Sequence, residues 1–356
     1  MKRNLFFKIG GLLTAVALLV TLAGCGETAA PTDASVESTV ITMTAAPTTE
    51  PTEAEPENLN PLTGLDDMNG EENPRMVGVV VGNNWKSRPQ VGIDKADMYL
   101  EMETEGGITR LLTVFASASH LPDKIGPVRS ARTPSVKMAK ALDLVYCHAG
   151  GSTTGKAEIG ALGVADLDGL SDSATFWRDQ ALMNSKGMEY SMMTGGEEVA
   201  ARIKSIGYRE ENDTTAPFVF GDKTGSGAGK TATVKISYSQ TVRFTYDAAT
   251  GLYTKANLTD GAYETHVSAD GVPITVSNVV VLYASKYMEN STTCDFDFSA
   301  GDGVLIRGGT SRPMSYTWST SALSFTEEDG TPLEVATGKT YICIVNTALE
   351  EDTVLA

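Results

Sequence analysis

Apolar runs and charged residues alternate between residues 97 and 152, and this order constrains the fold more than any other feature of the chain. Residues 97–103 and 108–116 predict two strands joined by a turn at Gly106-Gly107. A helix from Thr133 to about Leu142 follows, with its Thr at the N-cap and the next residue, a Pro, first in the helix. Residues 144–148 predict another strand. This strand, helix, strand order favours a mixed α/β domain with at least one crossover connection.

The rest of the chain extends this domain and then changes character. A strand at 76–81 precedes it, and a helix at 197–206, ended by Gly207, closes it. From about Pro217 onward the pattern is one of short strands without helical periodicity. We predict strands at 233–238, 241–246, 252–256, 274–283, 303–307, 315–319 and 340–345, with a hairpin loop at 247–251. The sequence therefore predicts a layered α/β domain at 59–215 and a smaller β-rich domain at 216–356.

The first 25 residues have the pattern of a bacterial lipoprotein signal. Basic residues precede an apolar segment, Ile9–Leu22, which is too short to span a membrane comfortably. Small residues lead directly to Cys25. This predicts a signal peptide at 1–24 and a diacylglycerol on the Cys25 sulfur. The alternative is an ordinary secretory peptide that is cleaved nearby.

Residues 25–58 are rich in Thr, Ala, Pro and Glu and contain almost no large apolar side chain. Such a segment cannot bury enough apolar surface to offset the entropy of ordering, so we predict a disordered tether. Together with a lipidated cysteine, the tether predicts a protein in the cell envelope, anchored through lipid to the outer face of the bacterial cytoplasmic membrane.

The charge balance limits the possible partners. The chain carries 45 acidic and 28 basic residues, a formal net charge of -17, and would be repelled by nucleic acid. We therefore exclude a nucleic-acid partner. The remaining candidates are the membrane, reached through the lipid anchor, and a small anionic ligand or acidic peptide held by a local basic cluster.

Three cysteines remain once Cys25 is lipidated. Cys147 lies in an apolar run and is expected to be a buried small hydrophobe. Cys294 and Cys343 either pair, as an exported protein allows, or stay free, and the sequence leaves both alternatives open. The sequence has no Cys-x-x-Cys spacing, and we predict neither a metal nor a cofactor.

Three glutamates alternate at the start of the central stretch. Glu101, Glu103 and Glu105 are predicted on one strand and on one of its faces, about 7 Å from one to the next. The first interpretation is a solvated strand face, and the second is a network with nearby arginines. A calcium site is the third, although it would need further oxygen ligands.

Arginines cluster just before the predicted helix at Thr133. Free N–H groups at a helix start attract anions, and the guanidinium groups of Arg129 and Arg132 beside them would form a clamp for a carboxylate or phosphate. The alternative is that both arginines pair with acids of their own domain.

His148 ends an apolar strand, which is where sites in α/β domains are usually built. One interpretation makes Ser152 a nucleophile and His148 its base, but the Gly-x-Ser-x-Gly elbow is absent from the sequence. The other makes His148 a hydrogen-bonding site residue. His120 and His266 are expected in surface loops.

Arg178 and Asp179 follow two aromatic residues. They are interpreted either as a self-paired surface corner or as part of the site, with Asp179 orienting His148 or Arg132.

Several motifs occur in an order typical of one family. They are Asn60–Gly64, Ser87–Gln90, Glu105–Arg110, Ile125–Arg132, His148–Ser152, Asp166–Gly169 and Phe176–Asp179. From Asn60 to near Val345 the chain resembles the YerB-like lipoproteins of Gram-positive bacteria. The resemblance implies an α/β domain followed by a smaller β-rich domain, and no known activity. Family members commonly carry a His-Asn segment after the Arg-Asp motif. Met188–Ser191 stands there in this chain, so a ligand contact through that histidine is not carried over.

Three functions fit these patterns. The chain is a binding module for an anionic or polar envelope ligand, an envelope hydrolase with Glu105 or Asp179 as the base near His148, or a scaffold without a ligand. We favour the binding module and leave open whether the protein is an enzyme. The residues expected to bind the ligand are Arg88, Glu101, Glu105, Arg110, Arg129, Arg132, His148, Ser152, Arg178 and Asp179.

Overall fold

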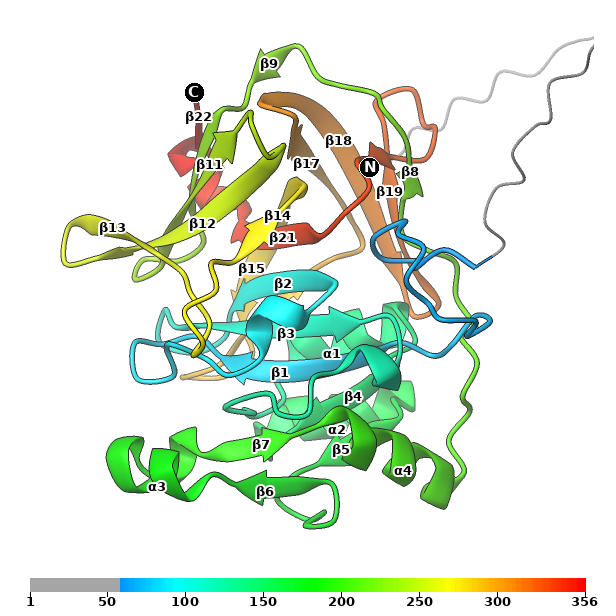
Figure 1. Cartoon of the computed structure of the whole chain (residues 1–356). Helices are drawn as coiled ribbons and strands as arrows, with labels where there is room; N and C mark the ends of the chain where they lie inside the picture. Colours follow the sequence, from blue (N-terminus) through cyan, green and yellow to red (C-terminus); the bar gives the residue numbers. More distant parts are fainter. Residues whose placement is uncertain (1–57) are drawn as a thin grey trace, which may run out of the picture. The chain divides into compact units, whose positions relative to one another are not determined.

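The structure is a computed structural model that describes residues 58–356 (Figure 1). The predicted signal peptide, the lipidation of Cys25 and all but the last residue of the predicted tether lie outside the described residues. Within residues 58–356, no helix is both long and apolar enough to cross a membrane.

One large mixed sheet crosses both halves of the described chain. The first half contributes β1 (Val77–Gly82), β2 (Met98–Glu103), β3 (Thr109–Phe115), β4 (Val145–His148) and β5 (Asp166–Asp168). The second half contributes β9 (Gly227–Ala228), β15 (Asn278–Met288), β16 (Cys294–Asp297), β17 (Ala300–Arg307), β18 (Thr310–Ser319), β19 (Ala322–Thr326) and β21 (Thr340–Asn346). The central order is β19-β18-β17-β15-β21-β2-β3-β1-β4-β5, with β9 and β16 paired beside this path.

The two halves join where β2 runs parallel to β21. Tyr99 of β2 lies opposite Tyr341 of β21, and their rings stack with centroids 5.2 Å apart. The fold class is as predicted, an α/β first half and a β-rich second half. The division into domains at residue 215 stays a prediction, because the large sheet is continuous across it.

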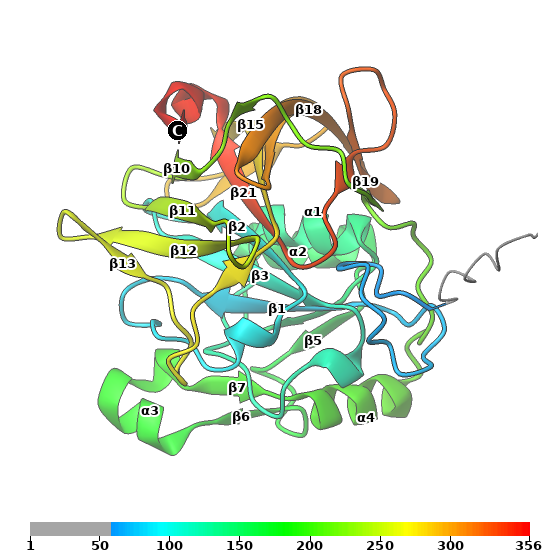
Figure 2. The ribbon, with the colours of Figure 1, turned by 45° about the horizontal axis from the view of Figure 1, so that its top comes forward.

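A second sheet of six strands comes from the C-terminal half and lies against the face opposite to α1 and α2 (Figure 2). It comprises β10 (Thr231–Lys235), β11 (Thr241–Asp247), β12 (Leu252–Thr259), β13 (Ala262–Thr265), β14 (Thr275–Val276) and β22 (Val354–Leu355). The predicted hairpin loop joins β11 to β12, with Gly251 at φ +73°, where a glycine avoids the Cβ clash.

Alternation along the strands builds two cores, one on each face of the large sheet. Leu100 and Met102 face the core that contains the buried side chains of α1 (Thr133–Ala141). Tyr99 faces the core shared with β10, β11 and β12. Successive side chains of a strand point to opposite faces, so β2, which is buried throughout, serves both cores.

The helices agree with the sequence only in part. α1 begins at Thr133, but Arg132 is its N-cap and Pro134 is its second residue, so the predicted cap was one residue too late. α4 (Gly196–Ile206) was predicted, whereas α2 (Thr153–Leu162) and α3 (Gln180–Lys186) were missed. α2 buries only Gly155 and Ile159, so its sequence carries little apolar periodicity.

Short elements complete the described chain. Two-stranded sheets pair β6 (Phe176–Arg178) with β7 (Met192–Thr194), and β8 (Val219–Phe220) with β20 (Glu334–Val335). Single turns of 3-10 helix occur at η1 (Ile93–Lys95), η2 (Ala118–His120) and η3 (Met188–Tyr190), with a longer one at η4 (Thr347–Asp352).

Candidate functional site

A buried charged cluster lies at the junction of the two halves. Glu101 of β2 is fully buried, and its Oε1 accepts hydrogen bonds from Asn83 Nδ2 at 2.7 Å, Thr109 Oγ1 at 2.7 Å and Gln240 Nε2 at 3.0 Å. Its Oε2 accepts from the Tyr341 hydroxyl at 2.5 Å. The prediction of a solvated face for Glu101 is therefore wrong, because the second half of the chain covers it.

Lys255 of β12 supplies the positive charge opposite Glu101. Its Nζ lies 3.5 Å from Glu101 Oε2, 2.7 Å from Asn257 Oδ1 and 3.1 Å from His266 Nδ1. Burial lowers the pKa of Lys255, and the nearby Glu101 opposes that shift. A buried charge persists only where a partner and hydrogen bonds compensate it, as they do at this junction.

His266 connects this cluster to the groove beside it. Burial, followed by the charge of Lys255, holds the pKa of His266 well below its usual range, so the ring is neutral. Lys255 can only donate, so Nδ1 accepts from Lys255, and Nε2 donates to Gln90 Oε1 at 2.9 Å. The expectation of a surface loop for His266 is wrong.

A groove of about 270 Å³ opens next to His266, and we call it the Arg88 groove. Its outer wall includes Trp85 and Arg88, which follow β1. Its other polar lining residues come from β12 and β13 and the residue that follows β13: Asn257, Thr259, Glu264, Thr265 and His266. The groove therefore lies between the two halves of the described chain and is polar on both sides.

Arg88 has no acidic partner. Within residues 58–356 no carboxylate lies within 4.0 Å of its guanidinium group, and its buried Nε has no hydrogen-bond partner. Burial lowers the pKa of Arg88, while the more distant Glu101 and Glu264 oppose the shift. A buried donor without a partner costs about 1–3 kcal/mol, more when it is charged.

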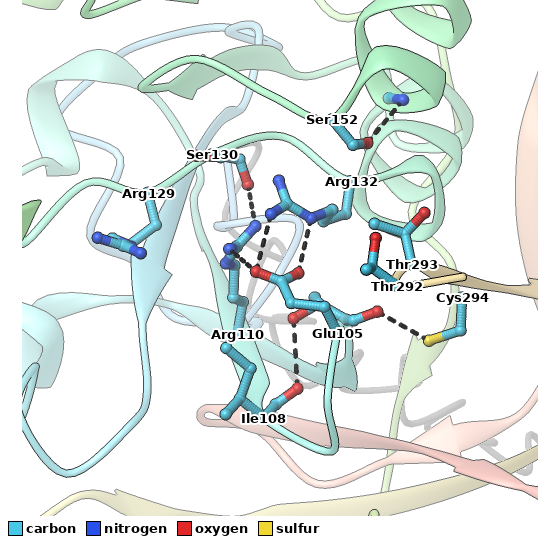
Figure 3. A network of polar contacts seen from close by, with 12 residues as sticks. Glu105, Ile108, Arg110, Arg129, Ser130, Arg132, Ser152, Thr292, Thr293 and Cys294 are labelled. Atoms are coloured by element: carbon cyan, nitrogen blue, oxygen red, sulfur yellow. Dashed lines mark hydrogen bonds and ion pairs between the residues drawn. The ribbon is translucent and has the colours of Figure 1, made fainter. Parts of the chain in front are cut away.

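Unlike Arg88, the arginines around Glu105 have an acidic partner (Figure 3). Arg110 Nη2 lies 2.6 Å from Glu105 Oε1, and Arg132 reaches both carboxylate oxygens, with Nε at 2.7 Å and Nη2 at 2.8 Å. Arg110 Nη1 also donates to the Ser130 carbonyl, and Arg132 Nη1 donates to the Ala131 carbonyl. The predicted network between a glutamate and arginines is present. Glu105 is the anion that Arg110 and Arg132 bind.

The protonation equilibria reflect this packing. Burial alone would raise the pKa of Glu105, but Arg110 and Arg132 outweigh it and lower that pKa. Burial lowers the pKa of Arg110 to about 9, and repulsion from Arg132 adds to the effect.

Glu105 lies beyond the end of β2, so the prediction that all three glutamates share one strand is also wrong. Glu103 is buried and pairs with Lys286 at 2.8 Å.

Arg129 does not contribute to the Glu105 cluster. Figure 3 shows its side chain directed away from Glu105. Its guanidinium pairs with Glu189 and lies 5.2 Å from the centre of the Tyr190 ring. The space between Arg110 and Arg129 amounts to only about 10 Å³. The predicted clamp of Arg129 and Arg132 therefore does not form.

His148 lies apart from the arginine side chains. It is 1% exposed, and its ring nitrogens lie 2.8 Å from the Gly150 carbonyl oxygen and 2.9 Å from Asp166 Oδ2. Ser152 instead caps α2, with its Oγ accepting from the Gly155 N–H at 2.9 Å. The Ser152–His148 catalytic interpretation fails on this geometry.

Arg178 and Asp179 have structural contacts. Asp179 caps α3 by accepting from the Leu182 N–H at 2.8 Å and pairs with Lys124, and the Lys124 contact is the main cause of its lowered pKa. Arg178 donates to the Met188 carbonyl. The two are not paired with each other, and the carboxylate that contacts His148 is Asp166, so the expected orienting role of Asp179 is not found.

One group among residues 58–356 has the composition of a metal site. Oxygens of Asp67 and Asp97 and a nitrogen of His120 lie within 4.8 Å of one another. His120 Nδ1 is 3.1 Å from Asp97 Oδ2, and this hydrogen bond raises the pKa of His120. Lys339 lies close enough to both aspartates for their charges to act on its pKa. An internal ion-pair cluster accounts for the arrangement, and His120 is half-buried rather than a free surface residue.

The three cysteines of the described chain, Cys147, Cys294 and Cys343, are buried and free. This resolves the alternative that the sequence left open for Cys294 and Cys343. Cys343 lies on β21, where its Cα is in register with Glu101, and burial raises its pKa well above the usual range.

Comparison with known proteins places the chain in a family. Residues 62–209 match the model described as "Protein of unknown function (DUF3048) N-terminal domain", and residues 232–342 match the corresponding C-terminal domain. The chain belongs to this YerB-like family. It is 30% identical over 295 residues to "Putative lipoprotein YerB" of Bacillus subtilis (strain 168), a match that covers 80% of this chain and 85% of the relative.

The crystal structure of the YerB protein from Bacillus subtilis has the same fold. It superposes with a TM-score of 0.72 at 28% identity and covers 84% of this chain and 99% of that chain. The predicted family is confirmed.

The sequence predicted Arg88 and Glu101 as site residues but did not predict that residues of the β-rich half surround them. Lys255 and Gln240 carried no motif and stand in the β-rich half, far from Glu101 in the chain. The available signal was the alternation in β12, where Lys255 stands two residues after Tyr253 and two before Asn257, on the face of the strand that is buried.

Proposed function

We propose that this protein is a lipid-anchored binding protein on the outer face of the cytoplasmic membrane, whose Arg88 groove holds an anionic group of a polar envelope ligand. The observation that carries the proposal is that Arg88 lines a groove of about 270 Å³ and has no carboxylate within 4.0 Å of its guanidinium group among the described residues. A carboxylate or phosphate oxygen bound in the groove would be its charged partner.

The electrostatics of the groove support an anion. His266 is neutral in the groove wall, and Lys255 behind it has Glu101 as its partner. Glu264 is the acidic residue that lines the groove, and it forms no ion pair with Arg88. The charge of Arg88 is therefore not cancelled by a contact inside the protein, in contrast to that of Arg132.

The hydrolase alternative lacks an accessible base. Asp166 lies within hydrogen-bonding distance of His148, but the His148 side chain is almost completely buried. Glu105 is held by two arginines, and Asp179 by a helix start and Lys124. A general base needs a free position beside its substrate, and these groups are occupied.

The binding proposal is tested with a small anionic sugar, galacturonate, by isothermal titration and by NMR shifts. Arg88→Ala is expected to weaken binding by roughly tenfold or more, the value of a charge-assisted hydrogen bond. Arg209→Ala is the matched control, since Arg209 is half exposed and pairs with Asp143 at 2.8 Å. Equal affinities of the wild type and Arg88→Ala for acetate, phosphate and galacturonate would refute the proposal.

The anchor has its own test. Cys25→Ala should release the protein from the membrane fraction, because the acyl chains can no longer be attached. Unchanged membrane association of this variant would contradict the lipid anchor without affecting the groove.

A further inference from the structure

We infer that the ligand of the Arg88 groove is an anionic glycan, a chain of sugar rings that carry carboxylate or phosphate groups. This inference rests on the proposed function and specifies the chemical class of its ligand. Its evidence is a series of aromatic rings and cations that begins at the groove and continues away from it.

The first ring of the series is Trp85, which lines the groove and is 73% exposed. An exposed indole at the edge of a polar groove offers a flat apolar face beside hydrogen-bonding groups. The face of an aromatic ring is electron-rich, so it attracts the C–H bonds on one side of a sugar ring.

The groove itself suits a sugar ring next to Trp85. Its volume of about 270 Å³ is that of a site for a small ring rather than a long peptide. Asn257, Thr259 and Glu264 line it with donors and acceptors for hydroxyl groups, and Arg88 provides the donor for an anionic substituent.

The series continues from Trp85 over the neighbouring surface. Lys86 Nζ lies 5.5 Å from the centre of the Trp85 ring and 5.8 Å from the centre of the Tyr190 ring. On the Tyr190 ring, Arg129 Cζ lies 5.2 Å from the centre. The order Trp85, Lys86, Tyr190, Arg129 alternates aromatic faces with basic groups, and we call it the Trp85 ledge. Arg129 at its end is already paired with Glu189, so Lys86 is the basic group of the ledge that has no ion-pair partner among residues 58–356.

A further basic residue contacts the backbone of Arg88. Lys186 Nζ donates to the Arg88 carbonyl oxygen at 3.0 Å, and burial lowers the pKa of Lys186. Basic side chains thus gather around the groove of a chain whose net charge is -17. A polymer that alternates rings and anionic groups matches this alternation of aromatic faces and basic side chains.

The inference is tested with galacturonate, its linear trimer, neutral galactotriose and tripolyphosphate, and with acetate as the reference anion without a sugar ring. Binding is followed by titration calorimetry and by the emission of Trp85 in a Trp177→Phe, Trp318→Phe background. The trimer is expected to bind at least about fivefold more tightly than the monomer, because an aromatic contact on the ledge adds to the groove. Glucose 1-phosphate, compared with galacturonate, distinguishes phosphate-bearing from carboxylate-bearing sugars.

Two variants separate the ledge from the groove. Trp85→Ala is expected to weaken trimer binding at least about fivefold, whereas Trp85→Phe should bind the trimer nearly as tightly as the wild type. Both should fold normally, since the Trp85 side chain is mostly exposed. Unchanged trimer affinity in Trp85→Ala, or binding of galactotriose as tight as that of the acidic trimer, would overturn the inference.

Failure of this inference can be told apart from failure of the proposed function. If tripolyphosphate binds in an Arg88-dependent manner and no sugar binds better than acetate, the anion site stands and the glycan is refuted. If no anion binds in an Arg88-dependent manner, both proposals fall.

Discussion

Arg132 and Arg88 carry the same charge in opposite surroundings. Arg132 donates twice to Glu105 and once to a backbone carbonyl, so little of its hydrogen-bonding capacity is free. Arg88 has a buried Nε without a partner and stands in the wall of a groove. The comparison shows that a guanidinium beside a helix start need not be a ligand site, because an acid of the same chain can occupy the position first.

The largest effect is expected where a buried cation loses its acidic partner, as Arg132 would without Glu105. Glu101→Ala leaves Lys255 fully buried without its counter-charge, and we expect a loss of about 3–5 kcal/mol in the free energy of unfolding. Urea denaturation measures it. Glu101→Gln combined with Lys255→Met should recover part of this loss, since no charge is then left unpaired. Unfolding unchanged in Glu101→Ala would mean that the pair is not needed.

A second test sets the two arginine sites against each other. Glu105→Ala leaves Arg110 and Arg132 without their acceptor, and we expect a loss of about 2–3 kcal/mol, reduced because the Glu105 side chain is 25% exposed. Arg88→Ala should not lower the free energy of unfolding by more than about 0.5 kcal/mol, since no ion pair is lost and the unpaired buried donor is removed with the side chain. Similar losses in both variants would remove the contrast between the sites.

A third test concerns the neutral histidine of the groove wall. The folded-state pKa of His266 is depressed, so its stabilising contribution is present above the unfolded pKa near 6.5 and is lost as the pH falls toward the folded pKa. Below about pH 6.5 the wild type should lose about 1.4 kcal/mol per pH unit from this residue. His266→Gln should lack this contribution. Parallel pH profiles of the two proteins would show that the pKa of His266 is the same in the folded and unfolded states, which would contradict the depressed pKa.

The last test concerns Ser152. Ser152→Ala removes the cap of α2 and should cost about 1 kcal/mol, measured by urea denaturation. Because Ser152 caps a helix and has no part in the groove, galacturonate affinity should stay at the wild-type value. A loss of affinity would return Ser152 to the binding site that the sequence assigned to it.

The sequence predicted the positions of strands and helices better than the contacts between side chains. The strands and the helix between residues 97 and 148 follow from local periodicity, and the structure has them within a few residues of the predicted positions. The pairing of Glu105 with Arg110 and Arg132 was among the alternatives, because these residues are near in the chain. The helices α2 and α3 were missed since each buries little apolar surface.

By itself the sequence determined the class of the fold, the β-rich second half and the family, because these depend on local patterns of apolar residues and on short motifs. Only the tertiary structure decided which charged side chains meet. The parallel pairing of β2 with β21 brings the second half of the chain over Glu101, so that Lys255 and His266 approach it from strands far away in sequence. Such contacts depend on how sheets pack, and side-chain periodicity along one strand contains no information about the strand that will cover it.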